Sequence, residues 1–337
     1  MTDSPKLAIV VACYNYEAYV EKAIRSVLDQ RRSDCELVVV DDGSSDRSWE
    51  IITETGATAF RIENRGQRGA CLFGFDKTTA PFVLFLDADD ELQPGSIGTI
   101  IDHLDPEVAK LQYSLARIDA RGDPIEGVSE PFDTFRDRTS LANRVLKKGI
   151  YRCPPTSGNV FRRDVCELLR EAEYDNIVDG VILFAAPLFG DIVSLSDYLG
   201  RYRIHDRNES GLGRLPDAAS LERDINRFVA RMEHLRAIIR RLRPDQPLFD
   251  PRAIFYFRER SFYLEIERGR RPRLIALLEL IAALLPEPIA IKNKTAMLTF
   301  FILAAALPPR RGKALLAYRL KTGDRTLLGF GRAIVGW

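Results

Sequence analysis

Neither sign of charge is in excess in this sequence. Its 49 lysines and arginines nearly balance its 48 aspartates and glutamates, and the formal net charge is +1. The overall charge therefore does not attract nucleic acid, and any anionic ligand must be held by local groups.

Cysteine is scarce, and its spacing offers no metal-binding or disulfide pattern. The number is odd, the residues are widely spaced, and no Cys-x-x-Cys pair occurs among Cys13, Cys35, Cys71, Cys153 and Cys166. This pattern favours reduced thiols in a cytoplasmic protein over a disulfide framework or a zinc site.

Long apolar runs are also missing. Leu7–Cys13 is apolar but short, follows Asp3 and has no small-residue cleavage pattern, so it is typical of a strand rather than of a signal peptide. The apolar stretches Leu274–Leu285 and Thr295–Leu307 are too short to span a bilayer, which needs about 20 residues.

What the sequence does contain is a regular alternation of strand and helix patterns. Its 337 residues, 46% hydrophobic and 29% charged, suffice for one large or two modest globular domains. Short apolar runs predict the strands Leu7–Cys13, Glu36–Val40, Ala57–Ile62 and Phe82–Leu86, and helical spacing predicts Glu17–Gln30, Arg47–Thr55 and a helix after Asn64. This alternation favours an α/β fold with a mostly parallel sheet flanked by helices.

Acidic residues follow two of these strands. Asp41 and Asp42 end the second, and Asp87, Asp89 and Asp90 end the fourth. The carboxyl ends of strands in an open parallel sheet face the ligand crevice, and carboxylates are hard oxygen ligands for divalent cations. The pattern therefore predicts a metal and diphosphate site.

A simpler role is open for each acidic group. Aspartate accepts backbone hydrogen bonds in turns and caps helices, so Asp90 could cap a helix that begins near Pro94. Either Asp41 or Asp42 could serve a capping turn before the helix from Arg47. Such a turn needs only one carboxylate, so we expect the other to contact ligand.

Five motifs in order over the first ninety residues together resemble glycosyltransferase family 2. They are Val11–Asn15 (VACYN), Ser26–Gln30 (SVLDQ), Val39–Asp46 (VVDDGSSD), Asn64–Gln67 (NRGQ) and Phe85–Asp90 (FLDADD). The resemblance implies the Rossmann-like GT-A fold, an inverting reaction and a nucleotide-sugar donor.

The resemblance also implies roles for individual residues in the donor half. Asp87 and Asp89 match the family's Asp-x-Asp, which holds Mn²⁺ or Mg²⁺ on the donor diphosphate, and Asp90 extends the motif on the acceptor side. The implied nucleotide-binding residues are Ala12, Tyr14, Asn15, Asp41, Asp42, Gln67, Asp87 and Ala88. In one departure, Cys71–Phe73 precede Gly74 where many relatives carry an Arg-Asn pair, so the donor contact of that pair is not carried over.

Asp179 resembles the family's catalytic base. Asp179, Gly190 and Tyr202 reproduce the family's spacing of an acidic residue, a helix-ending glycine and a Tyr-Arg-x-His motif. Relatives usually carry Glu in place of Val178, but one carboxylate suffices to take a proton. Asp175 is a competing base one helical turn earlier, and capping of the following helix is the simpler role for Asp179.

Two more residues complete the implied site. Gly158, in the strand pattern Thr156–Arg163, resembles a glycine that faces the acceptor, although a plain loop glycine fits as well. His205 follows Tyr202 and resembles a residue that completes the metal shell or contacts the diphosphate. A solvated loop histidine is the alternative.

Composition changes near residue 213. Long patterns rich in arginine and glutamate predict helices at Ser220–Leu242 and Pro251–Arg268, ahead of the two apolar stretches. We therefore divide the chain into a catalytic domain, 1–212, with a nucleotide and metal half, 1–92, and an acceptor half, 93–212, and a helical C-terminal region, 213–337. The apolar stretches either pack in the protein's own core or a dimer interface, or rest with their basic flanks on anionic lipid at the cytoplasmic membrane face.

These features predict an inverting, metal-dependent glycosyltransferase. It would move one sugar from a nucleoside diphosphate sugar, most often a UDP-sugar in this family, to a glycan or lipid-linked acceptor in cell-surface glycan or glycolipid assembly. Neither Trp49 nor Trp337 lies in a Gln-x-x-Arg-Trp motif, so a non-processive hexosyltransferase is expected. The competing functions are a non-catalytic nucleotide-sugar binder, suggested by Val178, and a haloacid-dehalogenase-like phosphatase, in which Asp-x-Asp normally follows the first strand.

Overall fold

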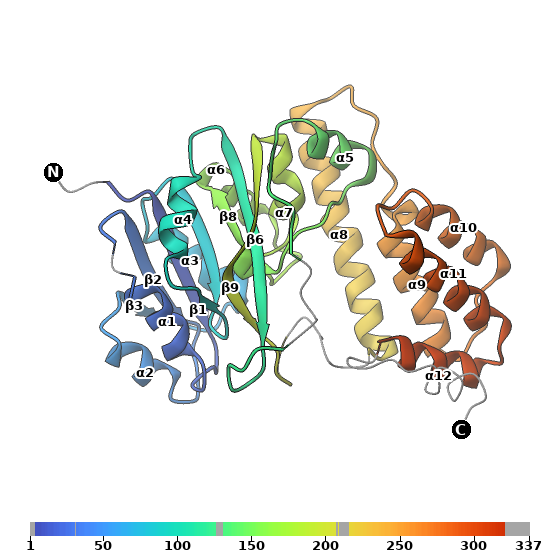
Figure 1. The fold of residues 1–337 in the computed structure, drawn as a ribbon, viewed down its shortest axis with the longest axis horizontal. Helices are drawn as coiled ribbons and strands as arrows, with labels where there is room; N and C mark the ends of the chain where they lie inside the picture. Colours follow the sequence, from blue (N-terminus) through green and yellow to red (C-terminus); the bar gives the residue numbers. More distant parts are fainter. Residues whose placement is uncertain (1–3, 31, 126–130, 207, 209–215, 321–337) are drawn as a thin grey trace. The chain divides into compact units, whose positions relative to one another are not determined.

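The structure, a computed structural model, describes residues 4–30, 32–125, 131–206, 208 and 216–320. It contains two compact units (Figure 1). Unit 1 comprises Met1–Ile204 and Ala237–Pro247, and unit 2 comprises His205–Arg236 and Leu248–Trp337. The long helix α8 (Ala218–Leu242) carries residues of both.

Unit 1 is built on one sheet, whose strands run in the order β3-β2-β1-β4-β8-β6-β9-β5, with β7 paired to β9. The strands are β1 (Leu7–Cys13), β2 (Cys35–Asp41), β3 (Ala59–Arg61), β4 (Phe82–Asp87), β5 (Glu91–Leu92), β6 (Val108–Ile118), β7 (Phe135–Asp137), β8 (Asn159–Arg162) and β9 (Asp191–Arg203). The predicted α/β class is confirmed, and β1 to β4 are the four strands predicted from their apolar runs.

The sheet has a parallel half and a mixed half. β1 pairs in parallel with β2 and β4, and β2 with β3. β8 runs antiparallel between β4 and β6, whereas β6 and β9 are parallel to each other. Because β8 is antiparallel to both of its neighbours, β4, β6 and β9 all point the same way.

The chain reverses its direction of winding at β1. It moves outward from β1 to β2 and β3 and then returns to place β4 on the other side of β1. Such a switch point opens a crevice at the carboxyl ends of the two central strands, where ligands bind in open α/β sheets. This topology therefore favours ligand binding at the carboxyl ends of β1 and β4.

Helices and short turns cover this sheet. They are α1 (Val20–Leu28), α2 (Ser48–Glu54), α3 (Gly66–Asp76), α4 (Ser96–Asp102), α5 (Ser140–Lys148), α6 (Arg163–Cys166), α7 (Val181–Ala185) and the 3₁₀ turns Thr156–Gly158, Glu167–Glu171 and Ala186–Leu188. α3 packs closely on the sheet, because a Cβ at Gly74 would lie 2.4 Å from Cγ1 of Val10. Only glycine permits this approach.

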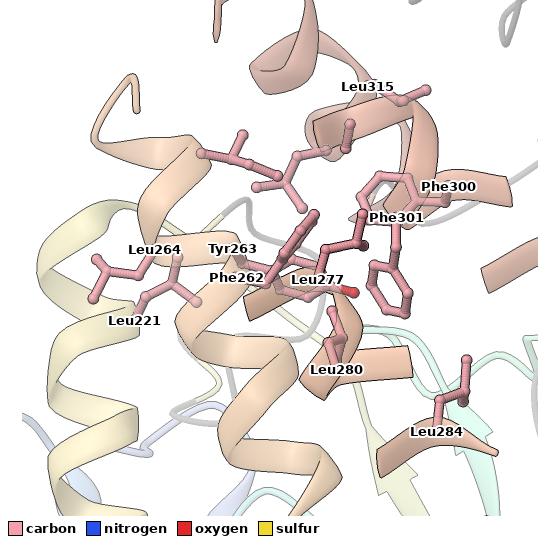
Figure 2. Packing of buried hydrophobic residues seen from close by; sticks show 13 residues of the cluster. Leu221, Phe262, Tyr263, Leu264, Leu277, Leu280, Leu284, Phe300, Phe301 and Leu315 are labelled. Carbon is pink, nitrogen blue, oxygen red and sulfur yellow. The ribbon is translucent and has the colours of Figure 1, made fainter. Parts of the chain in front are cut away.

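Unit 2 is helical. A 3₁₀ turn at Pro251–Ala253 precedes α9 (Phe255–Glu267), followed by α10 (Leu274–Leu284), α11 (Ile291–Ala306) and α12 (Pro309–Leu320). Figure 2 shows their shared core, in which Phe262, Leu280 and Phe301 lie together. One face of each predicted apolar stretch thus packs in the protein's own core. Within the described residues, none of the helices combines the length and apolarity that crossing a membrane requires.

Candidate functional site

The ends of three neighbouring strands form the floor of the candidate site. In the sheet register Cys13 of β1 pairs with Asp41 of β2, and Ala12 pairs with Asp87 of β4. Adjacent strands lie about 4.8 Å apart, so the backbones at Asp41 and Asp87 stand about 10 Å apart with the end of β1 between them. The two acidic loops therefore lie at the same edge of the sheet.

Three carboxylates gather where β4 ends. Asp87, Asp89 and Asp90 each offer an oxygen, and these oxygens lie within 4.8 Å of one another. Asp89 and Asp90 are buried, and Asp87 is partly buried. In the part of the chain that the structure describes, no other group of histidine, cysteine or acidic side chains has this spacing. Closely spaced hard oxygens fit a divalent cation such as Mn²⁺ or Mg²⁺.

Asp90 is the most deeply held of the three. Ser157 Oγ donates to its Oδ2 at 2.6 Å, and the backbone N–H of Arg203 donates to its Oδ1 at 2.9 Å. Burial raises the pKa of Asp90 well above its usual range, and the charge of Asp89 adds to the shift. Asp90 does not cap a helix, because α4 begins at Ser96 with Gly95 in the cap position. The alternative that Asp90 is a helix cap was therefore wrong. Its contact with the acceptor stays a prediction.

Arg203, for which no role was predicted, holds this turn in place. Its side chain is fully buried. Its Nε donates to the backbone oxygen of Asp89 at 2.8 Å, and its guanidinium pairs with Glu91 and lies 5.0 Å from the ring of Tyr19. Arg203 belongs to the Tyr-Arg-x-His motif, which was the signal in the sequence that could have drawn attention to it. Its charged hydrogen bonds fix the turn after β4, so it is a positioning residue.

The loop after β1 is tied to the loop after β2 by Asn15. Its backbone N–H donates to Ser44 Oγ at 2.9 Å, and its side-chain oxygen accepts from the N–H of Ser45 at 2.8 Å. Asn15 has φ of +58°, a left-handed conformation that asparagine tolerates better than most residues. Beside it the Tyr14 ring is 48% exposed, so it offers a flat surface to a ligand.

Asp41 and Asp42 differ in how their oxygens are used. Asp41 is fully buried, and its Oδ2 lies 3.1 Å from Nε of Arg61, whereas its buried Oδ1 has no hydrogen-bond partner among the described residues. Such an oxygen is costly to bury and suits an N–H of a ligand. Asp42 accepts from the N–H of Arg65 at 2.8 Å, and burial raises its pKa. Neither residue caps α2, where Asp46 Oδ1 accepts from the N–H of Ser48 instead.

One side chain joins the carboxylate cluster to the loop before α7. Gln67, near the start of α3, donates from Nε2 to Asp87 Oδ1 at 2.7 Å, and its Oε1 accepts from the N–H of Val178 at 3.2 Å. Because a single amide lies between them, Asp87 Oδ1 and the nitrogen of Val178 are within about 8 Å of each other. Val178 directly precedes Asp179.

The loop that carries Asp179 is held on the α3 side. The N–H of Arg68 donates to the oxygen of Asn176 at 2.8 Å. Asp175 is 1% exposed, and its Oδ1 accepts from the N–H of Ile177 at 3.2 Å, so its side chain serves its own turn. Asp179 is only partly buried. Of the two competing bases, Asp179 is therefore the one with a surface that an acceptor could reach.

Asp179 does not have the simpler role of capping α7. The helix begins at Val181 with Gly180 in the cap position, and no side chain bonds there. Behind this loop Lys110 is fully buried, with its Nζ 3.4 Å from Sγ of Cys153. Burial raises the pKa of Cys153, and the negative charge of Asp179 adds to the shift.

Two predicted residues are less clearly placed at the site. Gly158 ends a 3₁₀ turn before the short strand β8, and a Cβ there would lie 2.7 Å from Cβ of Pro154. Packing thus accounts for this glycine, and its contact with the acceptor stays a prediction. His205 is the first residue of unit 2, and its N–H donates to Asn208 Oδ1 at 2.6 Å. Its role as a metal ligand also stays a prediction.

The sequence is similar to known glycosyltransferases. The family model described as glycosyl transferase family 2 matches residues 8–169. The Nostoc sp. glycosyltransferase alr2836 is 35% identical over 215 residues, which are 60% of this chain and 66% of that protein. The Campylobacter jejuni GalNAc(5)-diNAcBac-PP-undecaprenol beta-1,3-glucosyltransferase is 35% identical over 104 residues, 29% of this chain and 34% of that protein. The chain thus spans just under two thirds of the first relative and a third of the second.

The fold is also similar to a solved structure. The crystal structure of residues 1–349 of S. aureus TarS in complex with UDP-GlcNAc has a TM-score of 0.50 to this chain, with 98% of this chain and 91% of that chain covered. The identity is 16%, so this likeness concerns the fold alone. It confirms the predicted GT-A architecture with helices after the sheet. The family match includes the five motifs and both acidic loops but ends before Asp179.

Proposed function

The chain belongs to glycosyltransferase family 2, and from this premise we propose that it transfers one sugar from a nucleoside diphosphate sugar to an acceptor hydroxyl with inversion. The observation that carries the proposal is the Gln67 amide, which links the Asp87 carboxylate to the loop of Asp179. It supports the proposal because it holds the loop of Asp179 next to the carboxylate cluster.

The loops after β1 and β2 would hold the nucleotide. Asp41 Oδ1, buried and without a partner among the described residues, suits a ring N–H of the base, and a uridine nucleotide offers one at its imide. The exposed Tyr14 would stack on the base, with Asn15 and Asp42 fixing the loops around it. Ala12 and Ala88, which have short side chains, would leave room beside the strand ends for the donor.

Asp87 and Asp89 would hold a Mn²⁺ or Mg²⁺ ion, with His205 as a third ligand. When bound, the ion supplies positive charge against the diphosphate leaving group. Asp90 and Arg203 would act as positioning residues, because they fix the turn without reaching the solvent. The closely spaced oxygens of the cluster support this assignment.

Asp179 would act as general base. Its carboxylate takes the proton of the acceptor hydroxyl as that oxygen bonds to the anomeric carbon, and the bond from this carbon to the diphosphate oxygen breaks on the opposite face. The electron pair of that bond leaves with the nucleoside diphosphate, so the configuration inverts in one step. Gln67 would set the distance between the two groups.

The acceptor class is proposed from a relative. The Campylobacter enzyme is named for an undecaprenol-linked acceptor, which supports a lipid-linked or glycan acceptor here, on the Gly158 side of the site. We propose one addition per encounter, in cell-surface glycan or glycolipid assembly on the cytoplasmic side.

A donor panel tests the function. The purified chain is incubated with UDP-, GDP- and TDP-sugars with Mn²⁺, and release of nucleoside diphosphate is followed with and without a lipid-linked acceptor preparation. We expect one donor to give release that a chelator abolishes. Binding of a donor without release under all these conditions would favour the non-catalytic alternative suggested by Val178. Hydrolysis of p-nitrophenyl phosphate would favour the phosphatase, which the family match already opposes.

A further inference from the structure

The outward face of α10 carries only apolar side chains. Positions i, i+1, i+4, i+8 and i+11 fall on one side of a helix, within an arc of about 100°. In α10 and the residue that follows it these positions are exposed and are filled by Leu274, Ile275, Leu278, Ala282 and Leu285. The opposite face is buried in the core of unit 2, as Figure 2 shows for Leu277, Leu280 and Leu284. The helix is thus apolar on its core face and on its solvent face.

The neighbouring helix α11, which packs against α10, leaves an uncharged stripe exposed as well. On its outward side the positions i, i+4, i+8, i+11 and i+15 are exposed and are Ile291, Thr295, Thr299, Ile302 and Ala306, and exposed Lys292, at i+1, lies at the edge of the same arc. Among the described residues, every large hydrophobic side chain that is more than half exposed lies in these two stripes, at 51 to 81% exposure. We call the ten residues of the two stripes the α10–α11 face.

Positive charge is concentrated in the segment of the chain that carries these two helices. Residues 269–313 contain eight lysines and arginines against two glutamates, a local formal charge of +6, whereas the remainder of the chain carries −5. The basic residues precede α10 or lie near the starts of α11 and α12, and they are Arg270, Arg271, Arg273, Lys292, Lys294, Arg310, Arg311 and Lys313. Arg270 and Lys313 pair with Glu265 and Glu267 of α9. One of the two acids, Glu279, pairs with Arg258 of α9. An apolar face with a basic rim is the pattern that binds the headgroup region of anionic lipid.

We propose that the α10–α11 face docks on an anionic lipid bilayer, with both helices lying in the plane of the interface. α10 and α11, of 11 and 16 residues, reach about 17 and 24 Å, short of the 30 Å hydrocarbon core, so they rest on the membrane and do not cross it. Charge favours lipid over a second copy of the chain, because pairing two such faces brings two +6 segments together. The proposal goes beyond the transfer reaction and does not depend on it.

Vesicle sedimentation tests the proposal without any enzyme assay. The full chain is spun with phosphatidylcholine vesicles and with vesicles containing phosphatidylglycerol at about 30%. We expect pelleting with the anionic vesicles, weakening as salt rises to 1 M because the basic rim is screened. A protein that stays in the supernatant with both vesicle types overturns the proposal.

Matched variants locate the surface. Leu278→Glu removes an apolar anchor, and Leu242→Glu makes the same change at another exposed helical leucine outside the α10–α11 face. We expect Leu278→Glu to weaken vesicle binding on the order of tenfold or more and Leu242→Glu to leave it unchanged. Equal effects of the two variants contradict the proposal.

Two double variants test whether vesicle binding depends on the basic residues near the α10–α11 face or only on the net charge. Arg271→Glu with Lys292→Glu, both exposed, is compared with Lys6→Glu and Lys147→Glu, which are exposed in unit 1 and change the net charge equally. We expect only the first pair to lower binding, on the order of tenfold. Thermal melting confirms that each variant is folded. If the wild type does not bind vesicles but forms a dimer in sedimentation velocity, and Leu278→Glu abolishes that dimer, the face is a dimer interface and the proposal is wrong.

Discussion

The two edges of the sheet in unit 1 both carry clustered carboxylates, and the clusters differ in what balances their charge. At the amino ends of β6 and β9, Arg136 lies 2.6 Å from both Asp105 and Asp191, and Arg138 lies 2.7 Å from Asp191 and 2.8 Å from Glu107. At the carboxyl end of β4, the three aspartates face one another within 4.8 Å.

The pKa values move in opposite directions at the two edges. Burial alone would raise the pKa of Asp191, but hydrogen bonds from Arg138 and Arg136 bring it below its ordinary value. Burial raises the pKa of Asp90, and the charge of Asp89 raises it further. Arginines of the chain neutralise the first edge, whereas the second concentrates negative charge, which a bound cation would stabilise. The first edge serves stability, and the second suits a function.

The largest expected effect is at the proposed base. Asp179→Asn keeps the shape of the side chain but cannot take a proton, so we expect turnover to fall by about 10² to 10⁴ with donor affinity nearly unchanged. Nucleoside diphosphate release measures the rate, and a thermal shift with the donor measures affinity.

Asp175→Asn is the matched control. Its carboxylate bonds the N–H of Ile177 and is buried, so we expect a loss of stability with turnover kept within a few-fold. If Asp175→Asn abolishes turnover and Asp179→Asn does not, the base has been assigned to the wrong residue.

The next effect concerns the carboxylate cluster. Asp89→Asn removes a charge that the cation would meet, so we expect turnover to fall by about 10² to 10³ and the Mn²⁺ concentration for half-activation to rise at least tenfold. A Mn²⁺ titration of the rate measures both. Asp191→Asn, at the opposite edge of the sheet, should leave the Mn²⁺ concentration for half-activation unchanged. An unchanged Mn²⁺ curve for Asp89→Asn would remove the metal assignment.

The sequence predicts the parallel half of the fold well, and there are physical reasons for this. Strands buried on both faces are continuous apolar runs, so the patterns for β1, β2 and β4 fall within a residue or two of their bounds. β6 and β9 were not predicted, because buried polar residues such as Lys110, Gln112 and Arg203 interrupt their apolar patterns. These residues are satisfied only by tertiary partners, which a local pattern does not contain.

The residues of the candidate site also divide into those that the sequence predicts and those that depend on contacts between distant segments. Asp87 and Asp89 could be proposed from the sequence because they follow their strand directly. The Gln67 bridge could not, since it accepts a hydrogen bond from a backbone N–H 111 positions away. Nor could the buried support of Asp90, which Ser157 provides from 67 positions away. Motifs locate groups on the chain, whereas contacts between distant backbone segments are decided only by the fold.

A smaller effect is expected at Gln67. Gln67→Met keeps the length of the side chain but loses the bonds to Asp87 and to the N–H of Val178, so the two halves of the site are no longer linked. Two hydrogen bonds contribute about 1 kcal/mol each, so we expect kcat to fall by up to about 30-fold while the KM for the donor changes little.

Gln30→Met is the matched control for this change. The Gln30 amide also joins two segments: it donates to the oxygen of Ser26 at 2.7 Å and to Ser96 Oγ at 3.4 Å and accepts from the N–H of Ile97 at 3.1 Å, but it lies outside the site. We expect it to lower the melting temperature without lowering kcat. Equal losses of kcat in both variants would mean that Gln67 acts only through stability.

The smallest effect is expected at the neutralised edge, and it depends on pH. The folded state lowers the pKa of Asp191 below the unfolded value of about 3.9, so the unfolded chain binds more protons as the solution is acidified. The stability from ionised Asp191 is therefore fully present above about pH 5 and is lost as pH falls through the folded pKa. Arg136 and Arg138 are about half exposed and solvent screens the pairs, so Asp191→Asn should cost about 0.5 to 1 kcal/mol of unfolding free energy at pH 7.

Urea unfolding at pH 7 and near pH 3 measures this cost. The difference in unfolding free energy between wild type and variant should shrink at the lower pH, and turnover should be unaffected. A difference that grows on acidification would mean that Asp191 is not held as a carboxylate by its arginines, and the contrast between the two edges would then lose its electrostatic basis.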